Sequence, residues 1–452
     1  MISVNPKNGK LIQVYNDYND EEIEDILNKS KTAFSIWKEY SINSRSKLLD
    51  HLAVQLEEKK EEFAEFITNE MGKTFASAIA EIEKCAMVCN YYASKSEEFL
   101  KDVKIQTDFN SSFVKFQPLG TILAIMPWNF PFWQVFRFAA PTLMSGNVCL
   151  LKHSSNVSGC ALAIEKLFQN VGFPNDIFRT LLIPSSKVDK IIHDSRVAAV
   201  SITGSESAGS SVGASCGKSI KKFVLELGGN DPFIVMPSSD IDEAVKAAVS
   251  SRVLNNGQSC IAAKRFIIHK DIYEEFLSKL NYEFSKLIVG DPMNETTDIG
   301  PLAKSEFVDE LHNQVVETIS QGGKLICGGF KIFGDGYYYS PTIISDVESN
   351  MTIFKEETFG PVAAVIKADS IEDSISIANN SKFGLGASAW SLESNEQNLL
   401  IEKIESGSVF INSMVKSNQN LPFGGIKASG VGRELGSYGL MEFVNVKTIV
   451  IE

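Results

Sequence analysis

The stretch Asn255–Cys260 reads Asn-Asn-Gly-Gln-Ser-Cys and places a single cysteine among small and amide residues. No second cysteine lies near enough in the sequence to suggest a disulfide or a metal site. A cysteine thiolate is a strong nucleophile, so Cys260 is a candidate for covalent catalysis. The common alternative is a buried thiol that packs as a small apolar side chain. The other motifs of the chain must decide between these two interpretations.

Two further stretches offer groups that would assist such a nucleophile. Asn129 lies in the segment Pro127–Pro131, directly after an apolar strand, and its amide could donate hydrogen bonds to a developing oxyanion. Glu226 ends a short apolar run just before two glycines. A carboxylate among apolar neighbours has a raised pKa and could act as a general base. The alternatives are a turn asparagine between two prolines, and a strand-end glutamate that pairs with Lys221 or Lys222.

Two stretches have the composition of a nucleotide site. The segment Thr203–Gly209, Thr-Gly-Ser-Glu-Ser-Ala-Gly, follows an apolar strand and opens a helix. Backbone N–H groups at a helix N-terminus can bind phosphate, but the spacing here is not the Gly-x-Gly-x-x-Gly fingerprint, so the motif is weak by itself. The segment Lys355–Pro361 combines acidic residues, an aromatic residue and a tight turn. A glutamate there could accept hydrogen bonds from ribose hydroxyls, or the segment could be a plain surface turn.

The elements that would position these groups begin with three helices between residues 20 and 104. The acidic residues 20–22 could cap the first helix, whose apolar residues recur at helical spacing. The second helix is expected over 44–71 with Gly72 as its stop, and the third over 76–100.

After residue 103 the pattern changes to short β-rich runs. Residues 103–125 alternate as strands do, with a turn at 108–111, and helical stretches such as 159–169 separate the later runs. These later runs are 148–151, 197–202, 223–227, 265–269, 363–366, 409–411 and 444–451. Short strands that alternate with helices predict parallel sheets covered on both faces. The expected fold class is therefore α/β, and two consecutive α/β domains fit a chain of 452 residues better than one.

Composition narrows the class of protein. The chain is 44% hydrophobic and 22% charged, and its net charge of −13 argues against nucleic acid or an anionic membrane as a partner. The N-terminus shows no signal-peptide pattern, and no apolar stretch reaches the roughly 18 residues of a membrane span. The seven cysteines show neither disulfide-like nor zinc-like spacing, and Cys85 and Cys89 suggest two buried thiols on one helix face. A cytoplasmic protein without a metal is expected.

Taken together and in this order, the motifs resemble those of the aldehyde dehydrogenase superfamily. A fifth motif, Pro422–Gly430, extends the resemblance to almost the whole chain. The resemblance implies a Rossmann-like cofactor domain, an α/β catalytic domain and a small β-arm used in oligomerisation, and hence a homodimer or homotetramer. The implied boundaries are 1–103 and 119–227 for the cofactor domain, 228–427 for the catalytic domain, and 104–118 and 428–452 for the arm.

The resemblance also implies a role for each candidate residue. Cys260 would attack the aldehyde carbon, and the Asn129 side chain and the Cys260 backbone N–H would hold the oxyanion. Hydride would pass to NAD(P), and Glu226 would activate the water that hydrolyses the thioester to a carboxylic acid. The positions that match cofactor contacts of the family are Trp128, Lys152, Gly204, Ser205, Glu357 and Phe359.

One departure from the family pattern bears on the cofactor. Residues 152–155 read Lys-His-Ser-Ser, where relatives that prefer NAD commonly read Lys-Pro-Ser-Glu and use the glutamate to bind the adenosine ribose. A carboxylate at this position would repel a 2′-phosphate, whereas Ser155 would hydrogen-bond it and Lys152 would supply charge. NADP is therefore the expected preferred cofactor, and NAD stays open as a second one.

The segment after Asn129 indicates a substrate class. With a helix that starts near Pro131, Trp133 and Arg137 share one face, which would look toward the thiol. A cation there suits an aldehyde with a carboxylate at its far end, and the segment 258–265 resembles the short succinate-semialdehyde dehydrogenase branch of the family. The alternative for Arg137 is a pair with a buried acid, away from the substrate. The expected substrate contacts are Trp133, Arg137, Ser259 and Ser417.

Three other interpretations stay open on the sequence. The same machinery could oxidise a medium-chain aliphatic or aromatic aldehyde, with Phe132, Trp133 and Phe136 lining an apolar tunnel. A binding or structural protein on this fold is disfavoured, because the candidate nucleophile, base and amide are all present. A cysteine hydrolase without a cofactor would call for a histidine base, but none of the five histidines falls in a matched motif.

Overall fold

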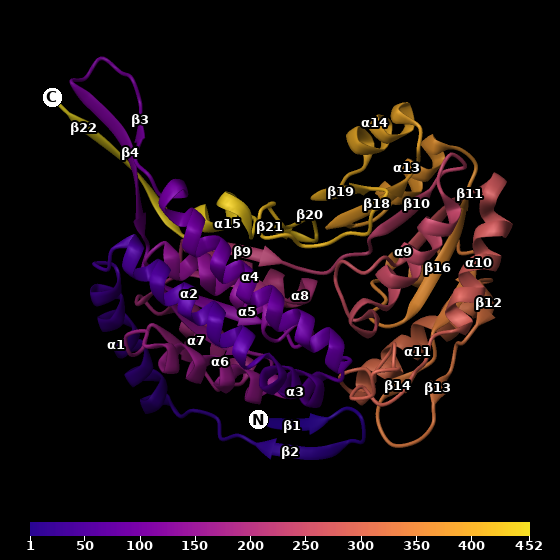
Figure 1. Cartoon of the computed structure of the whole chain (residues 1–452), viewed down its shortest axis with the longest axis horizontal. Helices are drawn as coiled ribbons and strands as arrows, with labels where there is room; N and C mark the ends of the chain where they lie inside the picture. Colours follow the sequence, from indigo (N-terminus) through magenta and orange to yellow (C-terminus); the bar gives the residue numbers. More distant parts are fainter.

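The computed structural model describes all residues from 1 to 452 and confirms the expected α/β class (Figure 1). The first half is built on a six-stranded sheet of order β21-β9-β8-β5-β6-β7, which is parallel except for β21. In this order the strands span Gly430–Val431, Lys222–Glu226, Val197–Thr203, Thr121–Met126, Val148–His153 and Phe178–Thr180. The carboxyl ends of the parallel strands share one edge, which is where ligands bind to open α/β sheets.

Helices cover both faces of this sheet, because alternate side chains of each strand point to opposite sides. Ile122 and Ala124 of β5 enter one core with α2–α6, and Leu123 enters another with α1, α7 and α8. These helices are α1 Asp20–Trp37, α2 Ile42–Glu58, α3 Lys60–Met71, α4 Phe75–Phe99, α5 Trp133–Met144, α6 Ser158–Val171, α7 Val188–His193 and α8 Glu206–Lys218.

The N-terminal helices follow the expected order with two corrections. Asn19, rather than the acidic residues 20–22, caps α1, and it exchanges hydrogen bonds with Glu22 in a capping box. The helix expected over 44–71 breaks at Lys59, whose φ of −114° and ψ of 18° are not helical. Gly72 ends α3 in the left-handed conformation, with a φ of 85°, as expected.

The second half of the chain forms a seven-stranded sheet of order β12-β15-β16-β11-β10-β18-β19, parallel except for the β12–β15 pair. In this order the strands span Lys324–Cys327, Thr342–Ser345, Val362–Ala368, Arg265–His269, Pro232–Val235, Gly386–Trp390 and Ser408–Ile411. Helices α9 and α10 pack on one face of this sheet, and α11, α13 and α14 pack on the other. They span Ile241–Val253, Tyr273–Ser285, Ser305–Ser320, Ile371–Asn379 and Ser394–Lys403.

A three-stranded antiparallel sheet projects from the body of the molecule (Figure 1). It consists of β3 Val103–Lys104, β4 Ser111–Pro118 and β22 Val444–Ile451, and β22 pairs with β4 along its whole length. Val446, Val450 and Ile451 are exposed on this sheet. The C-terminal strand therefore pairs with a segment that lies more than 300 residues earlier in the sequence.

Short elements complete the chain. They are β1 Ile2–Asn5, β2 Lys10–Val14, β13 Lys331–Ile332, β14 Tyr338–Tyr339, β17 Phe383–Gly384, β20 Ile426–Lys427, α12 Thr352–Lys355, α15 Gly436–Met441 and 3-10 turns at 155–157, 185–187, 254–257 and 270–272. None of the helices combines the length and the apolar character that a membrane crossing needs.

Candidate active site

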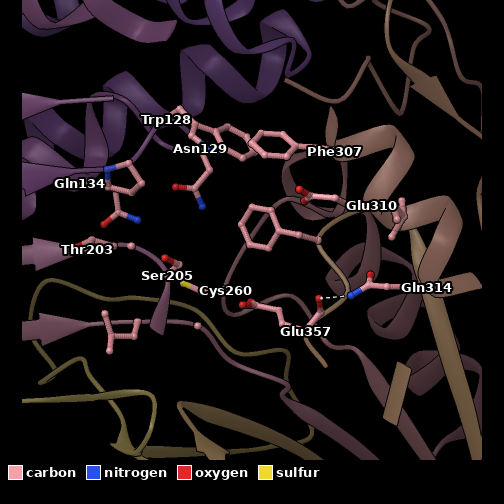
Figure 2. Close-up of a pocket in the computed structure, with 16 residues that line it drawn as sticks. Trp128, Asn129, Gln134, Thr203, Ser205, Cys260, Phe307, Glu310, Gln314 and Glu357 are labelled. Atoms are coloured by element: carbon pink, nitrogen blue, oxygen red, sulfur yellow. Dashed lines mark hydrogen bonds between the residues drawn. The ribbon is translucent and has the colours of Figure 1, made fainter. Parts of the chain in front are cut away.

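The main cleft lies between the two halves of the chain and has an empty volume of about 910 Å³, including the space open to solvent at its mouth. Figure 2 shows Asn129, Ser205 and Cys260 among the side chains that line this cleft. The lining brings together seven residues that the sequence analysis singled out. They are Trp128, Asn129, Gly204, Ser205, Cys260, Glu357 and Phe359.

Three consecutive left-handed residues shape the turn that precedes the thiol. Asn255, Asn256 and Gly257 have φ values of 58°, 59° and 77°, a conformation that glycine adopts freely and asparagine more readily than other residues. Asn255 Nδ2 donates to the Asn129 carbonyl at 2.7 Å, and the Asn256 amide donates to two distant carbonyls at 3.0 Å. A side chain on Gly257 would collide with the backbone of Gly360. The residue types of this stretch are therefore required by the backbone that presents the thiol.

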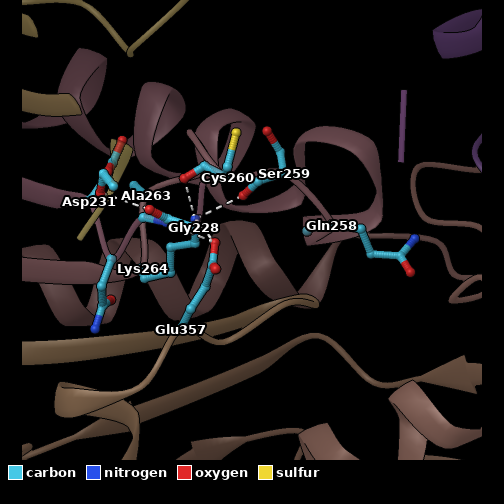
Figure 3. Close-up of polar contacts among 12 residues, drawn as sticks. Gly228, Asp231, Gln258, Ser259, Cys260, Ala263, Lys264 and Glu357 are labelled. Carbon is cyan, nitrogen blue, oxygen red and sulfur yellow. Dashed lines mark hydrogen bonds and ion pairs between the residues drawn. The ribbon is translucent and has the colours of Figure 1, made fainter. Parts of the chain in front are cut away.

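Lys264 contacts the backbone of this turn through its ammonium group (Figure 3). Its ammonium group donates to the carbonyls of Ser259 at 2.8 Å and Cys260 at 2.6 Å, and it pairs with Glu357 at 3.2 Å. Because Lys264 is fully buried, these three acceptors take the three hydrogens of its ammonium group. The peptide units on both sides of the thiol are thereby fixed.

The Cys260 thiol is neutral in this environment. Burial raises the pKa of Cys260 to about 12, with Lys264 opposing the shift and Glu357 adding to it. Since the thiolate is the reactive form, nucleophilic attack requires that a base remove the proton.

Asn129 is held by one hydrogen bond and by the loop around it. Its Nδ2 donates to the Gln258 carbonyl at 3.1 Å, which leaves the second N–H of the amide free toward the cleft. His153 supports the loop, because its Nδ1 accepts from the Ser154 N–H and its Nε2 donates to the Pro131 carbonyl at 2.9 Å. Burial lowers the pKa of His153 to about 4, so the ring is neutral and can keep both contacts.

Glu226 does not line the cleft. Its carboxylate is buried at the end of β9 beside Gly424, and neither oxygen has a hydrogen-bond partner. Burial, followed by the negative charge of Glu434, raises the pKa of Glu226 well above its usual range. The alternative of a pair with Lys221 or Lys222 is not formed, because the first donates to backbone carbonyls and the second pairs with another acid.

The segment that leads into α8, up to its N-cap Ser205, forms part of the wall of the cleft. Gly204 and Ser205 connect β8 to this helix, and Ser205 caps it by accepting from a backbone N–H of the first turn. The remaining N–H groups of that turn can receive a phosphate. Trp128 stacks on Phe307 with ring centroids 4.9 Å apart, and Phe359 meets Trp128 edge-on at 5.7 Å. Aromatic rings therefore enclose the cleft beyond the helix terminus.

Lys152 and Ser155 lie outside the main cleft, at and just after the end of β6. Lys152 lines a second cavity. One wall of this cavity is formed by α8, and its lining includes Asp189 and Ser215. Its ammonium group forms no hydrogen bond or ion pair, and burial lowers the pKa of Lys152. Ser155 is exposed, and its hydroxyl has no partner within the chain. An unpaired cation and a free hydroxyl near the end of one strand fit a phosphate group.

Arg137 lies on α5, and its contact with the substrate stays a prediction from the sequence. It is buried, pairs with Glu434 and donates to Thr203 Oγ1 at 3.3 Å. It is not part of the cleft lining. This is the alternative arrangement raised from the sequence, in which a buried acid neutralises the guanidinium. The i,i+4 spacing from Trp133 placed Arg137 on the correct helix but could not reveal the acid, which lies almost 300 residues later in the chain.

The other expected substrate contacts are divided between two places. Ser259 is buried next to Cys260 with its hydroxyl unpaired. Trp133 and Ser417 both contact Lys84, a residue that the sequence analysis did not select. Lys84 Nζ donates to Ser417 Oγ at 2.6 Å and lies 4.3 Å from the centroid of the Trp133 ring.

Sequence reasoning missed several further residues. Glu81 accepts from the N–H groups of Phe132 and Trp133 at 2.8 and 2.9 Å and so fixes the start of α5, and Lys73 pairs with it. A charged residue on an otherwise apolar helix face was the available signal for Glu81. The cleft residues that lie outside every motif are Phe307, Glu310, Leu311 and Gln314.

The features of the cleft define a class of protein. A buried thiol, an amide donor facing it and a helix N-terminus at the carboxyl edge of a parallel sheet are the parts of a nucleotide-binding α/β enzyme that works through a cysteine. No group of three or more His, Cys, Asp or Glu side chains is placed to hold a metal ion.

The chain belongs to the aldehyde dehydrogenase family, whose sequence model matches residues 1–449. It is 49% identical over 449 residues to a probable succinate-semialdehyde dehydrogenase [NADP(+)] of Synechocystis, covering 99% of each chain. It is 46% identical over 452 residues to succinate-semialdehyde dehydrogenase [NADP(+)] 1 of Mycobacterium tuberculosis strain H37Rv, again covering 99% of each. The crystal structure of succinic semialdehyde dehydrogenase from Streptococcus pyogenes in complex with NADP+ has a TM-score of 0.98 and 35% identity, with 100% of this chain and 99% of that one covered.

Proposed function

We propose that the protein oxidises succinate semialdehyde to succinate with NADP as the preferred cofactor. The observation that carries the proposal is full-length identity of 46–49% to relatives described as succinate-semialdehyde dehydrogenases [NADP(+)]. The cleft supports it, because Cys260, Asn129 and the first turn of α8 face one enclosed space.

In the proposed reaction, the Cys260 thiol gives its proton to solvent water, and Sγ bonds to the aldehyde carbon while the carbonyl π electron pair moves to the oxygen. The free Nδ2–H of Asn129 and the backbone N–H of Cys260 would stabilise the oxyanion that forms. Lys264 supports this step because its hydrogen bonds to the Ser259 and Cys260 carbonyls fix the orientation of the Cys260 N–H. Preset donors need no reorganisation when charge develops, which is the main source of their catalytic effect.

Glu226 is the proposed base that releases the product. It would take a proton from the water that attacks the thioester on Cys260. Because its carboxylate lies beside Gly424 and outside the cleft lining, we expect the side chain to rotate toward Cys260 when ligands are bound. Neither carboxylate oxygen has a hydrogen bond to break in that rotation.

The remaining residues fit a dinucleotide. NADP, when bound, supplies the acceptor for the hydride that leaves the substrate carbon. We propose that the first turn of α8 with Gly204 and Ser205 binds the pyrophosphate, that Glu357 accepts from ribose hydroxyls, and that Trp128 and Phe359 enclose the ring near the thiol. One cavity lies at the N-cap of α8 and a second lies along the side of this helix, so there is room for both nucleotides of such a ligand.

Lys152 and Ser155 are the proposed determinants of cofactor preference. Lys152 is a buried cation without a counter-ion, and the Ser155 hydroxyl is free. A 2′-phosphate would satisfy both groups, whereas the ribose of NAD carries only hydroxyls there. NAD is therefore the weaker cofactor in this proposal.

We further propose that the two sheets correspond to a cofactor domain (1–103 and 119–227) and a catalytic domain (228–427), and that the arm mediates a homodimer or homotetramer. The exposed apolar side chains of β22 support assembly. Residues 430–441 belong to the body, because β21 pairs with β9 and α15 packs on α5; the C-terminal part of the arm is therefore β22. Seven free cysteines support a reducing, cytoplasmic compartment.

The proposal is tested by NADPH formation from succinate semialdehyde, measured by absorbance, with NAD and butanal as parallel cofactor and substrate. We expect the highest kcat/KM with succinate semialdehyde and NADP, and no turnover by Cys260→Ala. Higher kcat/KM for butanal would exclude the proposed substrate, and turnover by Cys260→Ala at the parental rate would exclude the mechanism.

A further inference from the structure

His153 is a buried histidine that the proposed reaction does not use. It is the last residue of β6, and its side chain does not line the main cleft. Nε2 lies 2.9 Å from the Pro131 carbonyl oxygen, and Nδ1 lies 2.9 Å from the Ser154 nitrogen. Because a carbonyl oxygen can only accept, Nε2 carries the hydrogen, and Nδ1 of the neutral ring accepts from the Ser154 N–H. Both ring nitrogens are therefore occupied by backbone groups.

The contact with Pro131 fills a gap in the hydrogen bonds at the start of α5. The carbonyls of Phe130 and Phe132 accept from backbone N–H groups of this helix at 3.1 and 2.9 Å. The Pro131 carbonyl between them accepts from His153 alone. Pro131 is buried, and a buried carbonyl without a partner costs about 1–3 kcal/mol. The segment that precedes α5 is therefore held in place by the imidazole ring.

This segment, Pro127–Pro131, carries Asn129 and has hydrogen bonds to both halves of the chain. The turn that presents the thiol supplies two of them, one from the Asn129 amide to the Gln258 carbonyl at 3.1 Å and one from Asn255 to the Asn129 carbonyl at 2.7 Å. His153 supplies the one that joins the segment to β6. Since the proline ring restricts rotation between the held carbonyl and the preceding residue, a shift of that carbonyl moves the peptide units before it.

We propose that His153 is a positioning residue for the oxyanion, because it fixes the Pro127–Pro131 segment so that the free N–H of the Asn129 amide points to where charge develops. The proposal rests on the proposed function, in which Asn129 is an oxyanion donor. The histidine acts only through the backbone of this segment, since its ring is outside the cleft lining. A displacement of about 1 Å at a catalytic group can lower the rate by on the order of 10²-fold, so loss of this contact has a measurable effect.

His153→Phe tests the inference, because phenylalanine keeps a planar ring and lacks both nitrogens. We expect kcat for succinate semialdehyde to fall about 10-fold and KM to change by less than about 2-fold, because an oxyanion contact is made in the transition state. His153→Gln should restore most of kcat, since its amide nitrogen can donate to the Pro131 carbonyl. His269→Phe is the matched control, because His269 also ends a strand and accepts from a backbone N–H through Nδ1, and it should leave kcat unchanged.

A double-mutant cycle shows whether the loss passes through Asn129. In an Asn129→Ala background, His153→Phe should lower kcat by less than about 2-fold, because the donor that the histidine positions is gone. An equal loss of kcat in both backgrounds would mean that His153 only supports the fold, and would overturn the inference.

His153→Asn provides a second variant if His153→Phe does not fold. The shorter amide can keep a contact with Ser154 but does not extend to Pro131, so kcat should fall about 10-fold relative to His153→Gln; equal kcat for these two variants counts against the inference. A large loss for Asn129→Ala with none for His153→Phe would overturn the inference alone. Near-parental kcat for Asn129→Ala would refute the oxyanion role in the proposed function, and the inference with it.

Discussion

Replacing Asn129 with alanine separates a catalytic from a structural use of its amide. The amide donates to the Gln258 carbonyl at 3.1 Å, but that carbonyl also accepts from Asn255 Nδ2 at 3.0 Å. No buried carbonyl therefore loses its last partner, and the free energy of unfolding should fall by only about 1–2 kcal/mol. An oxyanion that loses one donor loses about 2.7–4 kcal/mol of stabilisation, which lowers kcat roughly 10²- to 10³-fold.

Asn255→Ala is the matched control, because it damages the same turn through the scaffold. It removes the donor to the Asn129 carbonyl at 2.7 Å and the second donor to Gln258, and it places alanine at a φ of 58°. Two lost hydrogen bonds and a strained backbone residue add up to about 2–5 kcal/mol of unfolding free energy. This variant should thus be clearly less stable than Asn129→Ala.

Steady-state NADPH formation and denaturant unfolding followed by tryptophan fluorescence measure the two effects. The expected pattern is a large loss of kcat with near-parental stability for Asn129→Ala, and a large loss of stability for Asn255→Ala. A folded Asn129→Ala protein that keeps more than about a tenth of the parental kcat would refute the oxyanion role. Equal destabilisation of the two variants would assign Asn129 to the scaffold.

Two further predictions concern charge. Ser155→Glu should lower kcat/KM with NADP relative to NAD by about 10- to 100-fold, because a carboxylate repels the 2′-phosphate; an unchanged cofactor ratio in parallel assays would contradict this. Lys264→Met should reduce the free energy of unfolding by about 2–5 kcal/mol, because it strips two buried carbonyls and Glu357 of their partner, and it should lower kcat as well. Exposed Lys246→Met is its control, and equal denaturation curves for the two variants would refute the clamp.

The sequence predicted most of the fold because its signals are local. The strands 265–269 and 444–451 have the expected bounds, and Gly72 ends α3 as expected. The break at Lys59 was missed because its neighbours are good helix formers, so nothing in the local pattern marks the change of backbone angles. The cap of α1 was misplaced by one residue, since acidic residues favour the first turn as well as the cap.

In the candidate site, too, the sequence predicted what depends on local motifs and missed what depends on contacts between distant residues. Asn129 and Gly204 follow β5 and β8, and neighbouring parallel strands share their carboxyl edge, so these two could be grouped from the sequence. Cys260 precedes β11 of the other sheet, so strand order alone did not place it with them. The partners of charged residues could not be foreseen. Arg137 and Glu434 are nearly 300 residues apart, and Lys84 and Ser417 more than 300 apart. Helical spacing predicts which face a cation occupies, but which cation is neutralised depends on contacts between distant segments.

The enclosed lysines link this distribution of charge to function. Lys73 and Lys264 have carboxylates of the chain as partners and hold the backbone around Asn129 and Cys260 in place. Lys84 and Lys152 have no such partner, although burial lowers the pKa of both. Because desolvation without an anion destabilises the fold, an unpaired lysine is retained at a cost that a bound ligand can offset. The 2′-phosphate of the proposed cofactor would bring such an anion to Lys152, so the cofactor preference follows from a charge that the chain itself leaves unpaired.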